Sequence, residues 1–196
     1  MHAVRYVSEL KNMKKMQQGF SLVELVIVIV VVGLLAVAAL PRFLDVTDEA
    51  KKASIGGVAG GFATGVLSAR AQWEAQARPT LTANNYPSIN YDGVNFWLTT
   101  SATSGYRDGY PLGLNTDDAT YPSGLTDQAC IDLMNNLLQN PPQVGTETQA
   151  ASNSNYKYSA KANSGAATCT YAQNEKGSQH EFVYEVNTGR VTVTLQ

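Results

Sequence analysis

Residues 18–43 read QGFSLVELVIVIVVVGLLAVAALPRF, and this stretch decides how the chain begins to fold. From Leu25 to Pro41 there are 17 residues (41 − 25 + 1) and no charge. At about 1.5 Å per helical residue the run spans roughly 26 Å, just enough for the hydrocarbon core of a membrane. One acid, Glu24, stands at its head, where an ionised carboxylate is costly unless another group uses it. The stretch therefore predicts a membrane helix in which Glu24 has a functional role.

A basic segment precedes the apolar run: residues 1–19 hold four basic residues, Lys14 and Lys15 among them. Three interpretations are open on this pattern. A cleaved secretory signal is one, because residues 36–38 read Ala-Val-Ala, a small-x-small cleavage site. A permanent anchor is the second, with the lysines keeping the N-terminus in the cytoplasm. In the third, the basic leader is removed and the apolar run stays in the mature protein.

The third interpretation rests on residues 14–25, KKMQQGFSLVEL, which resemble the prepilin signal of type IV pilins and the related pseudopilins. In that family a membrane aspartic peptidase cuts after the glycine, and the new N-terminal residue is N-methylated. The apolar segment is retained, first as an anchor and then as the core helix of a filament. The resemblance implies a prepilin leader at 1–19, cleavage between Gly19 and Phe20, and N-methylation of Phe20. Residues 1–12 make this leader longer than the family's usual one.

Glu24 gains a role from this resemblance. A free amine at Phe20 is a cation in an apolar setting and Glu24 is an anion in the same setting, so pairing offsets part of the cost of each. An offset of four residues puts both groups on one helix face, about 6 Å apart. A neighbouring subunit shifted along the axis could supply the amine instead. We therefore expect Glu24 to be an assembly residue that sets the register of an incoming helix.

The helix is expected to continue beyond Pro41, giving a transmembrane and assembly half at 20–43 and an amphipathic half at 44–78. The second half repeats apolar residues at spacings of three and four: Ile55, Val58, Phe62, Val66, Ala69 and Trp73. Gly33 and Pro41 are the expected hinge positions, since proline lacks an amide donor and glycine is a weak helix former. A break near Gly56-Gly57, with a second helix after it, is the alternative.

Residues 79–196 are predicted to form a globular antiparallel β domain. Asp92-Gly93 indicates a hairpin within 88–100, and Thr126 can cap a short helix over 127–138. The apolar face of that helix is expected at Cys130, Leu133, Met134 and Leu137. Two strands are expected at 180–186 and 190–195, with apolar residues at period 2. Residues 143–168 are polar and low in bulk, and are not expected to hold a shape alone.

The two cysteines are Cys130 and Cys169. In a chain with export features they favour one disulfide, and two free thiols are the alternative. The bond would close a 40-residue loop (169 − 130 + 1), which the chain-entropy model values at about 4 kcal/mol. Type IV pilins carry such a loop near the C-terminus. The resemblance thus implies an α+β pilin fold, a long N-terminal helix packed on an antiparallel β-sheet with a disulfide-closed C-terminal loop.

Several function classes are disfavoured. The formal net charge is −2 and there is no basic patch, so we expect no nucleic-acid partner. No nucleophile–base–acid set is apparent, and His180 is expected to be an exposed strand residue rather than a base. Asn115, Asp117 and Asp118 could form a calcium loop, but they lack EF-hand spacing and a solvated turn is favoured. We therefore expect no enzyme and no catalytic, cofactor-binding or metal-binding residues.

The runs at 41–47 and 56–62 look like those of pilins of the mannose-sensitive haemagglutinin (MSHA) pilus. The runs at 41–47 and 135–142 look closer to an accessory pilin of that system than to its major subunit. The resemblance implies partnership with a prepilin peptidase/methylase, a pilus assembly platform and other pilin subunits. It implies an inner-membrane precursor in a Gram-negative bacterium, then an extracellular filament for adhesion and biofilm formation. A pseudopilin of a type II secretion system is the alternative function. A calcium site at Asp117-Asp118 and no disulfide would favour that alternative.

Overall fold

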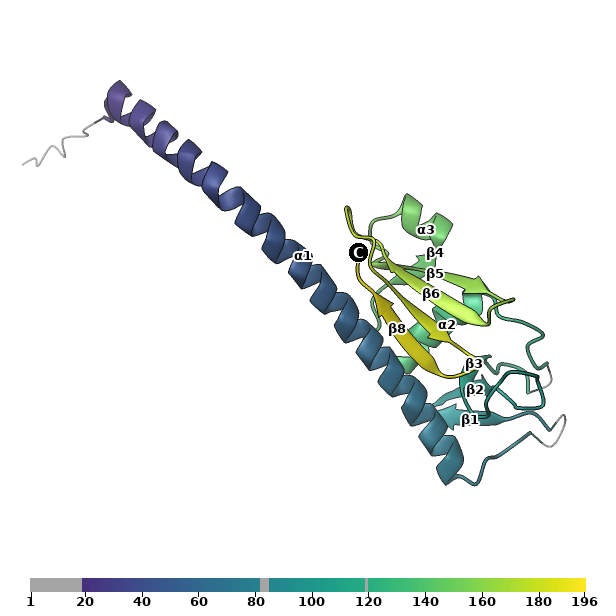
Figure 1. The fold of residues 1–196 in the computed structure, drawn as a ribbon. Coiled ribbons are helices and arrows are strands. Elements are labelled where there is room, and N and C mark those ends of the chain that lie inside the picture. The colour runs from purple at the N-terminus through teal and green to yellow at the C-terminus, as the bar shows by residue number, and fades with distance from the viewer. Residues whose placement is uncertain (1–18, 82–84, 119) are drawn as a thin grey trace, which may run out of the picture. The chain divides into compact units, whose positions relative to one another are not determined.

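The computed structural model describes residues 19–81, 85–118 and 120–196, so the predicted leader lies outside the described residues except for Gly19. The chain divides into two compact units, Met1–Asp45 and Val46–Gln196, which are described separately. The helices and strands are numbered in chain order, beginning with the long helix α1, and Figure 1 labels them except for β7. Their bounds are α1 Leu22–Ala75, β1 Ser88–Tyr91, β2 Val94–Leu98, β3 Pro111–Leu114, α2 Asp127–Leu137, β4 Val144–Thr146, α3 Glu147–Ser152, β5 Tyr158–Asn163, β6 Thr168–Gln173, β7 Glu181–Glu185 and β8 Arg190–Thr194.

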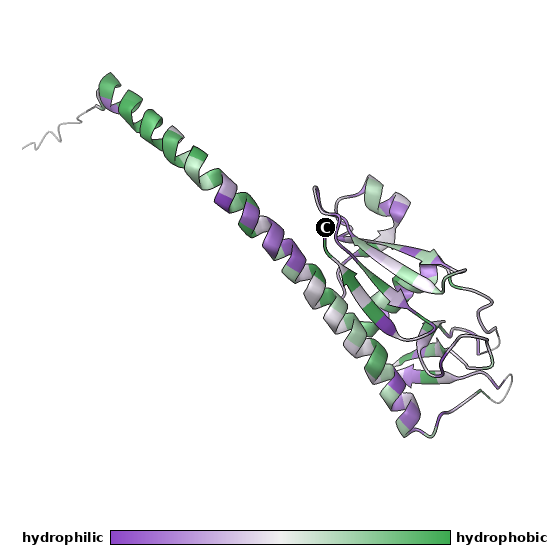
Figure 2. Ribbon diagram, viewed as in Figure 1, coloured by the Kyte–Doolittle hydropathy of each residue, from purple (hydrophilic) through white to green (hydrophobic). Residues whose placement is uncertain are grey.

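Helix α1 is continuous over 54 residues. It passes through Gly33, Pro41 and the Gly56-Gly57 pair without an interruption, so the alternative of a second helix after Gly56-Gly57 is wrong. Pro41 removes one amide donor from the ladder, yet the residues on either side of it remain helical. Figure 2 shows the hydropathy change along the helix, from a uniformly apolar first part to a mixed second part.

In unit 2, the buried stripe of α1 has the predicted helical period: Ile55, Ala59, Phe62, Gly65, Val66, Ala69 and Trp73. One predicted member differs, since Val58 is only half-buried and Ala59 is buried. The stripe centres on Phe62, whose ring lies 5.4 Å from that of Tyr171 and 5.3 Å from that of Tyr184. Aromatic contacts at these separations add to the apolar burial. They fix the second half of the helix on the face of a sheet.

That sheet has five strands in the order β4-β5-β6-β7-β8. Neighbours from β5 to β8 pair antiparallel, while β4 and β5 pair in parallel. Side chains alternate along β6 and β7, so Cys169, Tyr171, Phe182 and Tyr184 are fully buried and their neighbours are half-exposed. An antiparallel sheet commonly covers one face and leaves the other to water. The predicted α+β fold, a long helix on an antiparallel sheet, is confirmed, with a parallel edge pair added.

Residues 143–168 include α3 and the strands β4 and β5, which join the five-stranded sheet, so the expectation that they would not hold a shape alone stays a prediction. Helix α3 starts with a capping box: the Thr146 hydroxyl accepts from the Gln149 amide, and the Gln149 side chain accepts from the Thr146 amide. Strand β5 then buries Tyr158 and Ala160 completely or nearly so. The segment has few large apolar side chains. Its reciprocal helix cap and its addition to an existing sheet stabilise it instead.

The second sheet contains β1, β2 and β3 in that order, all antiparallel. The hairpin predicted at Asp92-Gly93 is confirmed, with φ of 50° at Asp92 and 84° at Gly93. Positive φ at both central residues is what a type I′ turn requires, and glycine adopts it without strain. The Tyr184 hydroxyl donates to the Pro111 carbonyl at 2.9 Å and so joins the two sheets.

Helix α2 has the predicted cap, since the Thr126 hydroxyl accepts from the Ala129 amide. Its predicted apolar face is buried, and Cys130 on that face forms a disulfide with Cys169 of β6. The predicted disulfide is thus confirmed. The Tyr171 hydroxyl donates to the Cys130 carbonyl at 2.7 Å, so a hydrogen bond accompanies the covalent link. Helix α2 and the second half of α1 therefore lie on the same face of the five-stranded sheet.

At Gly65, the backbone of α1 lies close to the end of α2. A Cβ at this position would collide with the Leu137 carbonyl oxygen. Gly57, on the same helix, is exposed and has nothing within 4 Å of such a Cβ. Packing therefore requires a glycine at position 65 and does not require one at position 57, so the two positions form a matched pair for substitution.

Replacing Gly65 with alanine is expected to destabilise unit 2 by about 1–3 kcal/mol, because the new methyl group must push α2 away. Gly57→Ala, the control, should instead gain about 0.5–1 kcal/mol from helix propensity. Urea unfolding of the full chain in detergent, followed by tryptophan fluorescence, measures both. Equal effects of the two substitutions would contradict the close approach.

Candidate functional site

The head of α1 is closed by its own side chains. The Ser21 hydroxyl accepts a hydrogen bond from the Val23 amide at 3.3 Å, and a Glu24 carboxylate oxygen accepts one from the Ser21 amide at 2.9 Å. This is a Ser-x-x-Glu capping arrangement, in which two amides left unpaired by the helix find acceptors. The carboxylate of Glu24 also lies at the positive end of the helix dipole. Within a single chain, Glu24 therefore already has a partner.

The capping role of Glu24 is one that the sequence interpretation missed. The signal was present, because a serine three residues before a glutamate at the start of an apolar run is a known helix-start pattern. The structure adds the direction of the side chain: the carboxylate reaches back to the residue next to Phe20. Any charge carried by the Phe20 nitrogen would stand close to it.

The predicted cleavage position lies just before the helix. Gly19 and Phe20 are not helical, and both are exposed, Phe20 with 85% of its surface accessible. A peptidase needs an extended, accessible backbone, which a residue inside a helix does not offer. The geometry at Gly19-Phe20 is thus compatible with cleavage, and the cleavage itself stays a prediction.

The apolar half of α1 is long and hydrophobic enough to cross a membrane. None of the residues in its most apolar 18-residue window is buried within the described chain. Leu25, Ile29 and Leu34, for example, are each at least 58% exposed. Soluble proteins rarely leave so large an apolar surface in water, so lipid or another protein surface must cover it. Figure 2 shows this stretch as the continuous green part of α1.

The two predicted hinge residues, Gly33 and Pro41, lie in this half, and both are exposed and helical. A Cβ at Gly33 would meet nothing within 4 Å, so packing inside the chain does not explain this glycine. A hinge that opens only after subunits pack together would not be visible in a single chain. The hinge role therefore stays a prediction.

His180 is not the exposed strand residue that was expected. Its side chain is 1% exposed, because it has the same strand parity as Phe182 and Tyr184 and so faces the core. Its Nδ1 atom accepts from the Gln196 amide at 3.1 Å, and its Nε2 atom is 3.6 Å from a carboxylate oxygen of Asp48. The sequence signal for this burial was the alternation that buries Phe182 and Tyr184, because continuing it two residues towards the N-terminus places His180 on the same face.

The acidic turn after β3 is closed by its own hydrogen bonds. The Asn115 side-chain amide donates to the Asp118 carboxylate at 2.7 Å, and Asp117 accepts from the Thr120 amide at 3.0 Å. Asn115 is 6% exposed, so the turn is anchored at one end and is less solvated than expected. Within residues 19–81, 85–118 and 120–196, no group of three or more His, Cys, Asp or Glu side chains could hold a metal ion.

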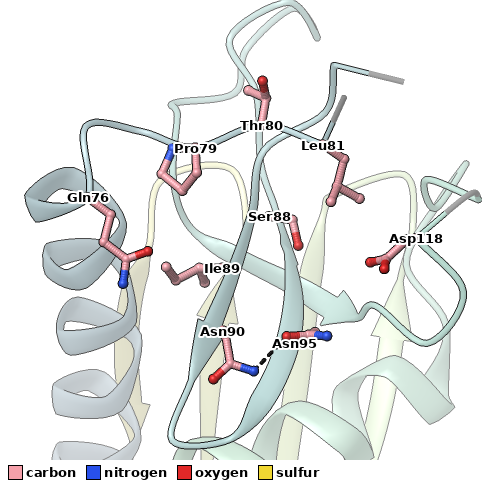
Figure 3. A pocket seen from close by; sticks show the side chains of 9 residues that line it. All are labelled: Gln76, Pro79, Thr80, Leu81, Ser88, Ile89, Asn90, Asn95 and Asp118. Carbon is pink, nitrogen blue, oxygen red and sulfur yellow. Dashed lines mark hydrogen bonds between the residues drawn. The ribbon is translucent and has the colours of Figure 1, made fainter. Parts of the chain in front are cut away.

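Figure 3 shows a shallow polar pocket of about 260 Å³ between the end of α1 and the β1–β2 hairpin. Amides and hydroxyls dominate its lining, with Asn90 donating to Asn95 at 2.7 Å. The one carboxylate, that of Asp118, already accepts from Asn115. This lining can form hydrogen bonds but offers no nucleophile with a neighbouring base, so it supports no particular reaction.

Comparison with known proteins supports the interpretation of the N-terminal stretch. Residues 14–40 match the family model described as the prokaryotic N-terminal methylation motif. The chain is 53% identical over 38 residues to the type IV narrow pilus major component PilA5 of Thermus thermophilus. It is 36% identical over 78 residues to a fimbrial protein of Neisseria meningitidis. No solved structure gives a significant match.

These matches cover only part of each protein. The first spans 19% of this chain and 33% of PilA5, and the second spans 40% of this chain and 40% of the fimbrial protein. Together with the methylation motif and the fold, they support a subunit of the pilin or pseudopilin type.

Proposed function

We propose that this chain is a type IV pilin, a subunit that is anchored in a membrane before assembly and is packed into a surface filament afterwards. The observation that carries the proposal is the uncovered apolar half of α1, headed by an N-terminal methylation motif. A helix of this kind needs a lipid surrounding before assembly and a protein surrounding after it. Packing against the same helix of other subunits provides this protein surrounding, and the apolar first half of the helix stays in the mature chain.

Maturation begins with removal of residues 1–19 by a prepilin peptidase on the cytoplasmic side. Hydrolysis of the Gly19-Phe20 peptide bond frees an amine at Phe20, which the same enzyme then methylates. The exposed, non-helical backbone at this bond supports the step. The new amine remains a cation after methylation, so the head of the helix carries a positive charge beside the Glu24 carboxylate.

Assembly then uses Glu24. The Ser21 amide holds the carboxylate at the head of the helix, which supports pairing with an amine at Phe20 or with that of a neighbouring subunit. In an apolar surrounding an unpaired charge is costly, so only a register that pairs both charges is favourable. Glu24 would thereby select where an incoming helix stops. Gly33 and Pro41 supply a segment that can lose helical hydrogen bonds as subunits pack.

The finer assignment is to an accessory or minor pilin of an MSHA-type pilus in a Gram-negative bacterium. On this proposal the precursor is a single-pass protein of the inner membrane and the mature subunit is extracellular, serving adhesion and biofilm formation. Its partners are other pilin subunits, the prepilin peptidase and the pilus assembly platform. The Cys130–Cys169 disulfide, which closes a loop on the exported side, supports the pilus over the alternative, a pseudopilin of a type II secretion system.

Two substitutions at Glu24 test its role. Glu24→Ala removes both the cap and the charge, while Glu24→Gln keeps an acceptor for the Ser21 amide and removes only the charge. We expect both variants to be processed and both to fail in filament assembly, with shed filaments reduced at least tenfold by quantitative immunoblotting. Glu49→Gln, at an exposed acid that pairs with Lys52, is the matched control and should assemble normally.

Normal filaments from Glu24→Gln would show that the cap, and not the charge, is what α1 needs, and would overturn the register proposal. Precursor that retains its leader in both variants would move the role of Glu24 from assembly to processing.

A deletion strain separates the two candidate functions. A pilus subunit predicts fewer or altered surface filaments and weaker attachment, with normal protein secretion. A pseudopilin predicts the reverse, loss of secreted enzymes from the medium with surface filaments unchanged.

A further inference from the structure

His180 is a buried histidine with two unlike surroundings for its ring nitrogens. The side chain is 1% exposed, on the core face of the sheet at the start of β7. Nδ1 accepts from the Gln196 backbone amide at 3.1 Å, just beyond the end of β8. Nε2 is buried, has no hydrogen-bond partner, and lies 3.6 Å from the Asp48 carboxylate on α1. None of the roles proposed above uses this group.

The bond to Gln196 fixes the tautomer of the neutral ring. A nitrogen that accepts from an N–H cannot carry a hydrogen itself, so the hydrogen of neutral His180 is on Nε2. That hydrogen faces Asp48, at a separation too long for a hydrogen bond. The neutral ring therefore bonds to the segment after β8 and does not bond to the helix.

The charged groups around the ring come from two directions. On α1, Asp48 pairs with Lys52 at 2.8 Å, and Lys51 donates to the Lys176 carbonyl at 3.0 Å. The β6–β7 connection contributes Glu175, which lines a surface hollow together with Lys51, and Lys176, whose carbonyl accepts from Lys51. The hydrogen bond from Lys52, with smaller contributions from nearby charges, holds the pKa of Asp48 below its usual range. Asp48 therefore stays ionised over the interval, roughly pH 5 to 8, in which histidines change charge.

We propose that His180 is a proton-operated latch, which holds the Leu195–Gln196 segment when neutral and releases it in favour of Asp48 when protonated. The added proton must go to Nδ1, since Nε2 already has one. Two N–H groups, of Nδ1 and of Gln196, then face each other and the bond between them is lost. At the same time the ring becomes a cation 3.6 Å from the Asp48 anion. Acid thus replaces a hydrogen bond to the segment after β8 with an ion pair to α1.

The direction of the pH effect depends on whether each partner of His180 favours the neutral or the protonated ring. Gln196 bonds only to the neutral ring, so its docking opposes protonation, and acid opposes its docking. Asp48 prefers the charged ring and so favours release. The segment is therefore held while the ring is neutral and freed when the ring is protonated. Because β8 is an edge strand with Leu195 half exposed, release would loosen that edge of the sheet.

Nuclear magnetic resonance of the full chain in detergent tests the latch. The sequence has two histidines, His2 and His180, so ¹⁵N-histidine labelling gives at most two rings to assign. We expect Nδ1 of His180 to be unprotonated at pH 8 and protonated at pH 5. Hydrogen-exchange protection of the Gln196 amide, corrected for intrinsic rates, should fall about tenfold over that interval, as loss of one hydrogen bond implies.

His180→Asn is the matched control, because its side-chain oxygen takes the position of Nδ1 and accepts from Gln196 without titrating. It should keep Gln196 protected at both pH values, while Asp48→Asn should move release to lower pH. A proton on Nδ1 at pH 8 would overturn the latch, as would an equal loss of protection in His180→Asn. Protection that is unchanged while the wild-type ring titrates would overturn it too, and this result needs no variant.

Discussion

The apolar surface of the first half of α1 is the constraint on which the rest of the molecule depends. From Leu25 to Pro41 there is no charge, and no residue of the most apolar window is buried within the described chain. A surface of that kind is unfavourable in water, so lipid or another protein surface must cover it. The capped head of the helix and the position of Glu24 just before the uncharged run are understandable on this basis.

The same helix solves a different problem in unit 2, where its second half holds the domain together. Phe62 lies among Tyr171, Phe182 and Tyr184, and Gly65 lets the end of α2 come within contact of the helix backbone. The disulfide then joins α2 to β6 on the same face. Substitutions on this stripe should therefore act on folding, whereas under the proposed function those at the head of α1 should act on assembly.

The sequence predicted the parts of the fold in which pattern and environment agree. The heptad-like stripe of α1, the Asp92-Gly93 turn, the Thr126 cap and the disulfide all followed from local rules, because each depends on few residues. The parallel β4–β5 pair and the order in residues 143–168 did not, since small polar residues acquire a structure there only by joining an existing sheet. The helical period allowed either Val58 or Ala59 to face the core, and packing in the folded domain selected Ala59.

The candidate site was predicted unevenly for a similar reason. The resemblance to prepilins pointed to Glu24 and to the Gly19-Phe20 bond, and both roles stay predictions, while the bond from the Ser21 amide to Glu24 needed the direction of a side chain. His180 was misjudged because its polarity was given more weight than its strand parity. A buried polar side chain requires partners from distant segments, here Asp48 and Gln196, and no local pattern reveals those.

The intact mass of the protein purified from its native membrane or filament tests the central claim most directly. The account predicts a chain that begins at Phe20, carries one N-methyl group (a net gain of CH₂ over the unmodified sequence), and lacks the two thiol hydrogens of Cys130 and Cys169. A mass that retains residues 1–19, or one that corresponds to cleavage after Ala38, would contradict it. In the first case the helix would be a simple anchor, and in the second the apolar run would be a discarded signal.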